Sequence, residues 1–309
     1  MLVQITELNK SYGATKAVDN LSFSFGSGEV YGFVGPNGAG KTTTMRVLCG
    51  LEEPQSGDCF VGGVSVLEYP EQAQRMVGYV PDNLPVHRDV SVHEYLDFFA
   101  RVHKVKNPRR RKVVEEIEDF TNLMGIRDKP LTGLSKGMKN RVSVARALIH
   151  DPPVLVMDEP ASGLDPRARI ELRDLLKVLS KQGKAILISS HILTELGEIC
   201  TGAVFIEKGK LLRAGSMEEL NRQTSEHRIL SIRPLDYPEK LQRHLLLQPH
   251  VADVRLLEGE VEVDLKGEDE ECCKLLTDLC AQGFNILEFR PRRANLEQIF
   301  MTVTKGHVQ

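Results

Sequence analysis

Eight consecutive residues, Gly35-Pro-Asn-Gly-Ala-Gly-Lys-Thr42, have the composition of a triphosphate-binding loop. They fit the pattern G-x-x-x-x-G-K-S/T, in which glycines let successive backbone N–H groups point at phosphate oxygens. Lys41 is expected to reach the β- and γ-phosphates, and the Thr42 hydroxyl is suited to ligate Mg²⁺. The nucleotide-binding residues predicted here are Gly35, Pro36, Asn37, Gly38, Ala39, Gly40, Lys41, Thr42 and Thr43.

The flanking segments can position this loop. Residues 29–34 form a short apolar run that favours a strand, and residues 42–49 favour a helix. A strand, a glycine-rich loop and a helix in this order form the usual context of a phosphate-binding loop. The start of the helix would add the positive end of its dipole. The alternative is a glycine-rich turn that binds nothing.

Two carboxylates follow a second apolar run. Residues 154–157, Val-Leu-Val-Met, are typical of a strand buried on both faces of a parallel sheet, and Asp158 and Glu159 follow it directly. Open α/β sheets bind ligands at this end of their strands. Asp158 is suited to hold Mg²⁺, and Glu159 to polarise a water that attacks the γ-phosphate. The alternative is a solvated acidic strand end.

Between these elements lies Leu134-Ser-Lys-Gly-Met-Lys-Asn-Arg141, which leads into a helical run. Taken alone, Ser135 is a helix N-cap candidate. With its surroundings, the chain resembles the ATP-binding subunit of an ABC transporter over residues 1–223. The motifs in order are the phosphate loop, the signature at 134–138, the acidic strand end at 154–159, Ser162-Gly-Leu-Asp165, and Ser190-His191.

The resemblance implies a P-loop ABC ATPase domain over residues 1–224, with a mixed-sheet core and a helical subdomain at about 91–150. It implies that ATP is bound with Mg²⁺ and hydrolysed, with Lys41, Glu159 and His191 as the catalytic residues. His191 resembles the switch histidine that contacts the γ-phosphate. Ser135 and Gly137 resemble the signature residues that touch ATP held by a partner subunit.

Two further positions have both a functional and a structural interpretation. Tyr12 resembles the aromatic residue that stacks on adenine, although it also suits packing beside a hairpin turn. Asp165 resembles the residue of a loop that crosses the dimer interface. Asp165 followed by Pro166 is also a good helix start, and both interpretations of Asp165 can hold.

Two positions depart from the usual ABC pattern. The signature commonly reads Ser-Gly-Gly-Gln, whereas this chain has Ser135-Lys-Gly-Met138. Asp82 stands where a glutamine normally senses Mg²⁺ and the γ-phosphate. Aspartate can ligate Mg²⁺ but is charged and shorter by one methylene. These features resemble bacterial exporter-type ATPases that work with ABC-2 permeases.

Bulk composition limits the remaining possibilities. The chain has 309 residues, 41% hydrophobic and 27% charged, with a formal net charge of −3. This charge gives no basic field for nucleic acid, so none is expected as a partner. No run reaches about 18 apolar residues, and the first residues do not resemble a signal peptide. The six cysteines show no C-x-x-C pair and are expected to be buried thiols.

The helical segment contains a basic run at residues 109–112, Arg-Arg-Arg-Lys. Asn107-Pro108 is expected to start its helix, with Asn107 as the cap. Apolar residues then recur at helical spacing from Val113 to Leu123. The basic run is either a solvated face or a contact with anionic lipid headgroups.

Beyond residues 223–227 a second domain is expected at 225–309. Its pattern is strand 228–233, helix 237–247, strands 251–257 and 260–265, helix 270–282, strand 285–290 and helix 296–303. The order β-α-β-β-α-β predicts a small α+β, ferredoxin-like domain. It resembles the accessory C-terminal domain of ABC-2-type ATPases, and a role in dimer contact or regulation is a hypothesis by analogy.

Together these features predict the ATP-hydrolysing subunit of an ABC-2-type transporter. The resemblance alone implies that the transporter is an exporter. It would be a homodimer or heterodimer of ATPase subunits at the cytoplasmic face of the membrane, attached through a separate permease. The alternatives are a soluble ABC ATPase that acts on a nucleoprotein or other soluble partner, and a nucleotide sensor that does not hydrolyse ATP. The transported substrate cannot be derived from this chain.

Overall fold

The computed structural model describes residues 2–84, 89–190, 193–224, 227–257, 259–267, 269–291, 296 and 299–300. The chain separates into two compact units, Met1–Met217 and Glu218–Gln309. The two units divide between residues 217 and 218, whereas the sequence predicts a domain boundary between residues 224 and 225. Helix α8, Met217–Thr224, covers the residues between these two positions.

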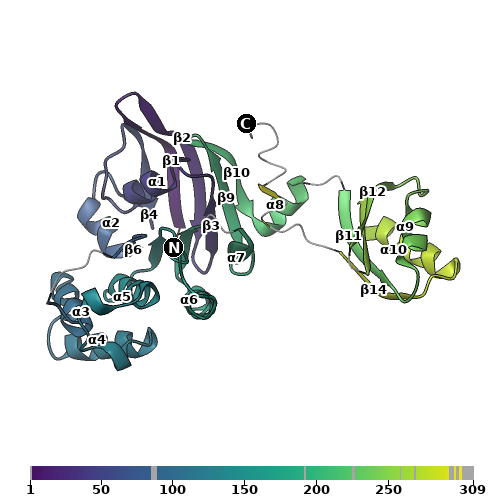
Figure 1. The fold of residues 1–309 in the computed structure, drawn as a ribbon. Coiled ribbons are helices and arrows are strands. Elements are labelled where there is room, and N and C mark those ends of the chain that lie inside the picture. The colour runs from purple at the N-terminus through teal and green to yellow at the C-terminus, as the bar shows by residue number, and fades with distance from the viewer. Residues whose placement is uncertain are drawn as a thin grey trace. The chain divides into compact units, whose positions relative to one another are not determined.

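The first unit is built on a mixed sheet whose described strands run in the order β10-β9-β3-β8-β7-β6 (Figure 1). Strands β3, β8, β7, β6 and β9 pair in parallel, and β10 pairs antiparallel with β9. Strands β3, β7 and β8 are buried at every residue, as expected for apolar runs covered on both faces. The bounds are β3 Val30–Val34, β6 Val77–Val80, β7 Val154–Met157, β8 Ala185–Ser189, β9 Gly202–Glu207 and β10 Lys210–Ser216.

A second, antiparallel sheet has the order β2-β1-β4-β5. Its hairpin turns at Gly13, which adopts a positive φ of 57°. Alternate residues of β2 face a core shared with the central sheet, where Phe23 packs against Phe33 with ring centroids 5.5 Å apart. The bounds are β1 Leu2–Tyr12, β2 Thr15–Gly26, β4 Ser56–Val61 and β5 Val64–Ser65.

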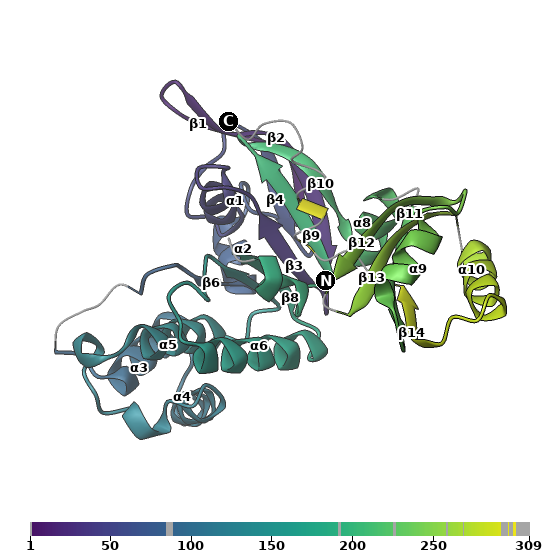
Figure 2. The same ribbon diagram turned by 45° about the vertical axis from the view of Figure 1, so that its right-hand side comes forward.

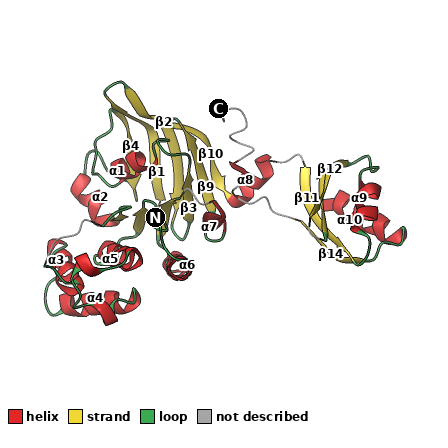
Figure 3. Cartoon of the chain, in the orientation of Figure 1, coloured by secondary structure: helices red, strands yellow, loops and turns green. Residues whose placement is uncertain are grey.

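Helices lie against the sheets of the first unit (Figure 3). The helix residues buried there are mainly apolar. Helix α6 buries residues at spacings of four and three, ending with Leu176 and Leu179, as an amphipathic helix does. Met45 and Leu48 of α1 lie in the core shared by the two sheets. The bounds are α1 Lys41–Leu48, α2 Pro70–Met76, α6 Pro166–Lys181 and α7 Leu193–Gly197.

Helices α3, α4 and α5 lie within the segment where a helical subdomain is expected, about residues 91–150 (Figure 2). The apolar residues of this segment form a core of their own. Ser91 and Glu94 form a capping box that starts α3. Helix α4 begins one residue later than expected, with Pro108 at its N-cap position and no capping side chain. The bounds are α3 Val92–Val102, α4 Arg109–Phe120, the 3₁₀ turns Met124–Ile126 and Leu131–Gly133, and α5 Lys136–Leu148.

The second unit confirms the ferredoxin-like fold. Its described strands are ordered β12-β13-β11-β14 and every pair is antiparallel. Strand β13 alternates between buried and partly buried residues, because one face meets the apolar core. The expected helix 296–303 lies mostly outside the described residues. The bounds are β11 His227–Pro234, α9 Pro238–Leu245, β12 Val251–Leu257, β13 Glu260–Lys266, α10 Asp269–Ala281 and β14 Ile286–Pro291.

The cysteines divide between core and surface. Cys49, Cys59 and Cys200 are buried, and burial raises the pKa of each thiol, so these side chains stay protonated. The expectation of buried thiols is wrong for Cys273 and Cys280, which are exposed on α10. Cys272, Leu275 and Leu279 form the buried face of that helix, and Cys273 and Cys280 are turned away from it.

Candidate active site

The glycine-rich loop joins β3 to α1, and close backbone neighbours explain its composition. Gly40 has a φ of 103°, and a Cβ there would lie 2.3 Å from the Ala17 carbonyl oxygen. A Cβ on Gly35 would lie 2.4 Å from the carbonyl oxygen of Ile206. Larger residues would therefore force the loop away from the sheet. The expected strand, loop and helix are confirmed by the fold.

Lys41, the first residue of α1, is folded against this loop. Its side chain is buried, and its Nζ donates to the Gly35 carbonyl at 2.7 Å and to the Pro36 carbonyl at 3.3 Å. Burial lowers the pKa of the amine, and the charges of Glu159 and Asp158 oppose that shift. A cation and two carboxylates thus share one small region of low solvent exposure.

Asp158 is the centre of a hydrogen-bond network at the carboxyl ends of three adjacent strands. It is only 4% exposed. The Thr42 hydroxyl donates to its Oδ2 at 2.7 Å, and the Ser189 hydroxyl donates to its Oδ1 at 2.7 Å. The backbone N–H of Glu159 donates to the Ser189 Oγ at 2.8 Å. Both carboxylate oxygens are therefore oriented before any ligand arrives.

Glu159 stands beside a small cavity of about 120 Å³. Its φ of 48° lies in the left-handed region, which is uncommon for a residue with a Cβ. The same cavity is lined by Asp82, Lys136 and Asn140. The Asn140 amide donates to the Pro160 carbonyl at 2.7 Å, which ties α5 to the turn after Glu159.

The signature segment begins α5. Ser135 is its N-cap, and its hydroxyl accepts from the Met138 N–H at 3.3 Å. Met138 packs against the core of the helical subdomain, so the apolar side chain in place of glutamine has an apolar environment. Lys136 reaches the Ser162 hydroxyl at 3.5 Å. Asp165 caps α6 by accepting a hydrogen bond from the Ala168 N–H at 2.9 Å. This agrees with the prediction that Asp165 starts a helix.

Tyr12 lies at the end of β1 with 48% of its surface exposed. Its hydroxyl is hydrogen-bonded to Glu52, and Lys10 lies over its ring at 5.4 Å. Burial and the hydrogen bond to Glu52 raise its pKa, and Thr43 of the phosphate loop is also a neighbour. The ring is therefore exposed and close to the loop, as a stacking platform requires.

Comparisons with known proteins agree with this geometry. The profile described as "ABC transporter" matches residues 18–162, and the profile described as "ATP-binding protein DrrA1-3-like, C-terminal domain" matches residues 215–304. The chain is 33% identical to "Nod factor export ATP-binding protein I" of Ralstonia nicotianae, over 98% of this chain and 94% of that protein. It belongs to the ATP-binding proteins of ABC transporters.

Other similar proteins extend the comparison. The "Linearmycin resistance ATP-binding protein LnrL" of Bacillus subtilis is 28% identical over 98% of both chains. A solved structure described as "Structure of ATP binding subunit of ABC transporter" has a TM-score of 0.67 at 27% identity, covering 72% of this chain and 93% of that one. The cbiO1 protein of Clostridium perfringens has a TM-score of 0.64 at 26% identity, covering 80% and 95%. The chain is thus an ATP-binding and ATP-hydrolysing ABC transporter subunit.

The structure brings together most of the residues expected in the site of this ABC ATPase. Lys41, Thr42, Asp158 and Glu159 meet at the carboxyl ends of the central strands. Asp82 is exposed and shares the small cavity with Glu159. His191 lies outside the described residues. Sequence analysis missed Ser189, although its place at the end of a buried strand beside the two carboxylates was a usable signal.

Proposed function

We propose that this ABC ATPase works as a head-to-tail dimer that drives a separate ABC-2-type permease in export. Relatives similar along almost the whole chain support this proposal, because two of them are named for Nod factor export and linearmycin resistance. No described helix is long and apolar enough to cross a membrane, so a permease would have to supply the transport path. The division into an ATP-binding domain, 1–224, and an accessory domain, 225–309, belongs to the same proposal.

In this proposal each ATP lies between two copies of the chain. Lys41 holds the β- and γ-phosphates, and Tyr12 stacks on adenine. Ser135 and Gly137 of the opposite copy contact the γ-phosphate. Their exposed and partly exposed positions at the start of α5 support such a contact. Asp165 then lies near the interface while it caps its own helix.

The hydrolytic step depends on Glu159, which we assign as the general base for the attacking water. Two features support this role: its backbone is fixed by Ser189, and it borders a cavity large enough for a few water molecules. His191 is assigned as the switch histidine on the sequence motif alone. ATP binding would close the dimer, and hydrolysis would reopen it.

Mg²⁺ is the proposed cofactor, and the donor set fits it. The Thr42 hydroxyl and the Asp158 carboxylate lie within hydrogen-bond distance of each other, and hard oxygen ligands of this kind suit Mg²⁺. Asp82 could add a carboxylate in place of the usual amide. When bound, Mg²⁺ would neutralise negative charge on the phosphates. The protein groups hold the loop and the carboxylates in position.

Coupling to the permease would use the helical subdomain and the segment near Asp82, at the cytoplasmic face of the membrane. Arg146 of α5 supports a mechanical link here. Its guanidinium donates to the Tyr79 carbonyl of β6 at 2.8 Å and lies over the Phe99 ring of α3 at 5.4 Å. A displacement of α3 would therefore reach the strand that leads to Asp82.

The Glu159→Gln variant tests the proposed mechanism. It should bind ATP with near-normal affinity, lose about 10²–10⁴-fold in turnover, and persist as a dimer with ATP and Mg²⁺. Turnover, nucleotide binding and mass by light scattering would be measured together. Lys41→Ala is the matched control, because it should lose ATP binding and stay monomeric. Normal turnover in Glu159→Gln would overturn the assignment of the base.

The identity of the partner separates transport from the main alternative. The Glu159→Gln protein would be recovered by affinity purification from gently solubilised membranes of its native cell, with ATP and Mg²⁺ present. A stoichiometric partner with several apolar helices supports the permease. Recovery with ribosomes, nucleic acid or another soluble partner would favour a non-transport ABC ATPase. The two tests can fail independently of each other.

A further inference from the structure

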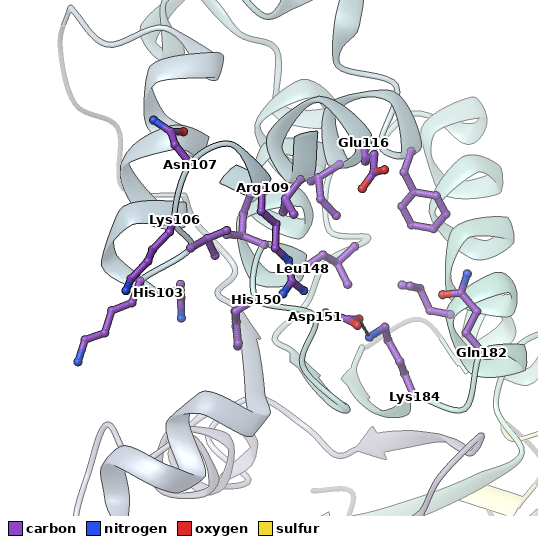
Figure 4. A pocket seen from close by; sticks show the side chains of 17 residues that line it. His103, Lys106, Asn107, Arg109, Glu116, Leu148, His150, Asp151, Gln182 and Lys184 are labelled. Carbon is purple, nitrogen blue, oxygen red and sulfur yellow. Dashed lines mark hydrogen bonds and ion pairs between the residues drawn. The ribbon is translucent and has the colours of Figure 1, made fainter. Parts of the chain in front are cut away.

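A second and larger cavity lies away from the proposed nucleotide site. It has a volume of about 820 Å³, is open to solvent on one side, and is bordered by α4, the segment before α4, and the C-terminal ends of α5 and α6 (Figure 4). Asp151 and Lys184 border it immediately before strands β7 and β8. The phosphate loop and Asp158 follow the opposite ends of the central strands, so the cavity belongs to the other edge of the sheet.

One stripe of α4 runs along this cavity. Arg109, Val113, Ile117 and Phe120 line it at spacings of four, four and three residues, which places them on one helix face. From first to last, the stripe covers about 16 Å of helix axis. Its first residue is cationic and the other three are apolar. Leu148 and Leu179 add apolar surface from α5 and α6.

The cationic end has an excess of unpaired charge. Lys104, Lys106 and Arg109 line the cavity, and none of them has an ion-pair partner among the described residues. Arg109 also occupies the first position of α4, where no side chain caps the helix and no acidic residue lies in the first turn. A cation is unfavourable at this positive end of the helix dipole, whereas an anion is favourable.

The acidic residues of the lining are already engaged. Lys184 contacts Asp151 at 2.5 Å, an ion pair drawn as a dashed line in Figure 4. Lys112 contacts Glu116 at 3.7 Å. The lining also includes His150, whose ring nitrogens are buried and whose ring stacks on His103 with centroids 3.9 Å apart. The lining thus combines cations without ion-pair partners at one end with apolar surface further along α4.

We propose that this cavity binds a linear anionic amphiphile, with a carboxylate or phosphate head group at Arg109 and Lys106. The hydrocarbon chain would lie along Val113, Ile117 and Phe120. A chain of about a dozen carbons matches the length of the stripe. A small hydrophilic anion would leave the apolar surface exposed, and a neutral lipid would make no ion pair with these exposed cations. This site is independent of the proposed transport role.

Titration calorimetry of the full chain with dodecanoate, and separately with dodecyl phosphate, tests the site. Arg109→Gln should weaken binding about tenfold or more, because a hydrogen-bonded charge pair is lost. Arg111→Gln is the matched control, since Arg111 is exposed on the same helix and does not line the cavity. It should leave the affinity unchanged. Inorganic phosphate should bind far more weakly than dodecyl phosphate.

Chain length tests the apolar part separately. Dodecanoate should bind about fifteenfold more tightly than decanoate, because two methylenes are buried. Phe120→Ala should reduce this ratio several-fold, since Phe120 is at the far end of the stripe. Thermal unfolding and ATP turnover of each variant, both expected to be unchanged, would exclude a folding defect. Equal affinity for the two chain lengths would contradict the proposed orientation.

Vesicles of phosphatidylcholine with phosphatidylglycerol distinguish a membrane source from a free amphiphile. If Arg109→Gln weakens dodecanoate binding and Arg111→Gln does not, the cavity is the site. Loss of vesicle binding in Arg109→Gln alone would then identify a bilayer lipid as its source. Equal loss of vesicle binding in both variants, with no dodecanoate binding, would overturn the proposal in favour of a nonspecific basic surface.

Discussion

The two ends of strands β7 and β8 carry similar groups in contrasting environments. At the carboxyl ends, Asp158 and Ser189 are buried and hydrogen-bonded. At the amino ends, Asp151 and Lys184 form an ion pair whose carboxylate side chain is 90% exposed. Burial raises the electrostatic and desolvation cost of any lost contact, so similar hydrogen bonds carry different weight at the two edges.

The difference also affects the backbone. At the carboxyl ends the chain leaves the sheet in tight loops, and a Cβ added to Gly40 would lie 2.3 Å from the carbonyl oxygen of Ala17. At the amino ends the corresponding loops border an open cavity of about 820 Å³. One edge is therefore preorganised for a defined ligand, whereas the other leaves space and unpaired cations. Four predictions test this contrast.

The largest effect is expected from Gly40→Ala. The added Cβ would lie 2.3 Å from a backbone oxygen, so the loop must move and ATP binding should be lost. Gly38→Ala is the matched control in the same loop, because Gly38 also has a positive φ, 79°, but open space around its Cβ position. It should lower the free energy of unfolding by only about 1–2 kcal/mol. Nucleotide titration and urea unfolding would compare them. Equal behaviour would show that the backbone contact has no special role.

Ser189→Ala should have the next largest effect. It leaves one Asp158 oxygen and the Glu159 N–H without their shared partner, in a position that is fully buried. The free energy of unfolding should fall by about 1–3 kcal/mol. ATP turnover should fall as well, because the base loses its backbone anchor. Denaturant unfolding and steady-state turnover measure the two effects. Unchanged turnover in a destabilised protein would limit Ser189 to a structural role.

His150→Gln should change how stability depends on pH. Burial lowers the pKa of His150 to about 4, and the neighbouring His103 ring, stacked at 3.9 Å, contributes in the same direction. The unfolded chain, with a histidine pKa of about 6.5, binds more protons between these values. Stability should therefore rise with pH from about 4 to 6.5, and less steeply in the variant. Lys184 and Asp151 also face His150, the former lowering and the latter raising its pKa. The free energy of unfolding of the original protein and of the variant would be measured at pH 4.5, 5.5 and 7. An equal rise with pH in both proteins would contradict this expectation.

The smallest effect is expected from Asp151→Asn. The exposed carboxylate is screened by water, and Lys184 retains a hydrogen bond to the Pro152 carbonyl at 2.8 Å. The free energy of unfolding should change by less than about 1 kcal/mol. The corresponding change at the other edge, Asp158→Asn, should cost more in both stability and ATP turnover. Equal losses of stability and ATP turnover in Asp151→Asn and Asp158→Asn would contradict the proposed difference between the two edges of the sheet.

Sequence analysis predicted the carboxyl-end site well because its chemistry is local. Eight contiguous residues specify the phosphate loop, and two adjacent carboxylates end one apolar strand. The two-domain fold also followed from strand and helix patterns. The roles assigned to Tyr12, Ser135 and His191 remain predictions, because they concern a nucleotide and a second copy of the chain.

The amino-end cavity could not be predicted in the same way. Arg109, His150 and Lys184 are distant in sequence and meet only after α4, α5 and α6 have packed. No spacing rule connects them. The pairing within the antiparallel sheet was also not predictable from the sequence, because β1 and β4 join residues about fifty positions apart. Long-range pairing depends on the whole fold, whereas a motif depends on neighbours.

The hydroxyl of Thr42 has one proton, and in this structure Asp158 accepts it. A ligand that draws this hydroxyl toward itself would remove the hydrogen bond that Asp158 Oδ2 accepts. Asp158 is joined through Ser189 to the backbone of Glu159. The arrival of a ligand beside Thr42 can thus be sensed at the backbone of Glu159, the proposed base, through three hydrogen bonds and without moving a helix.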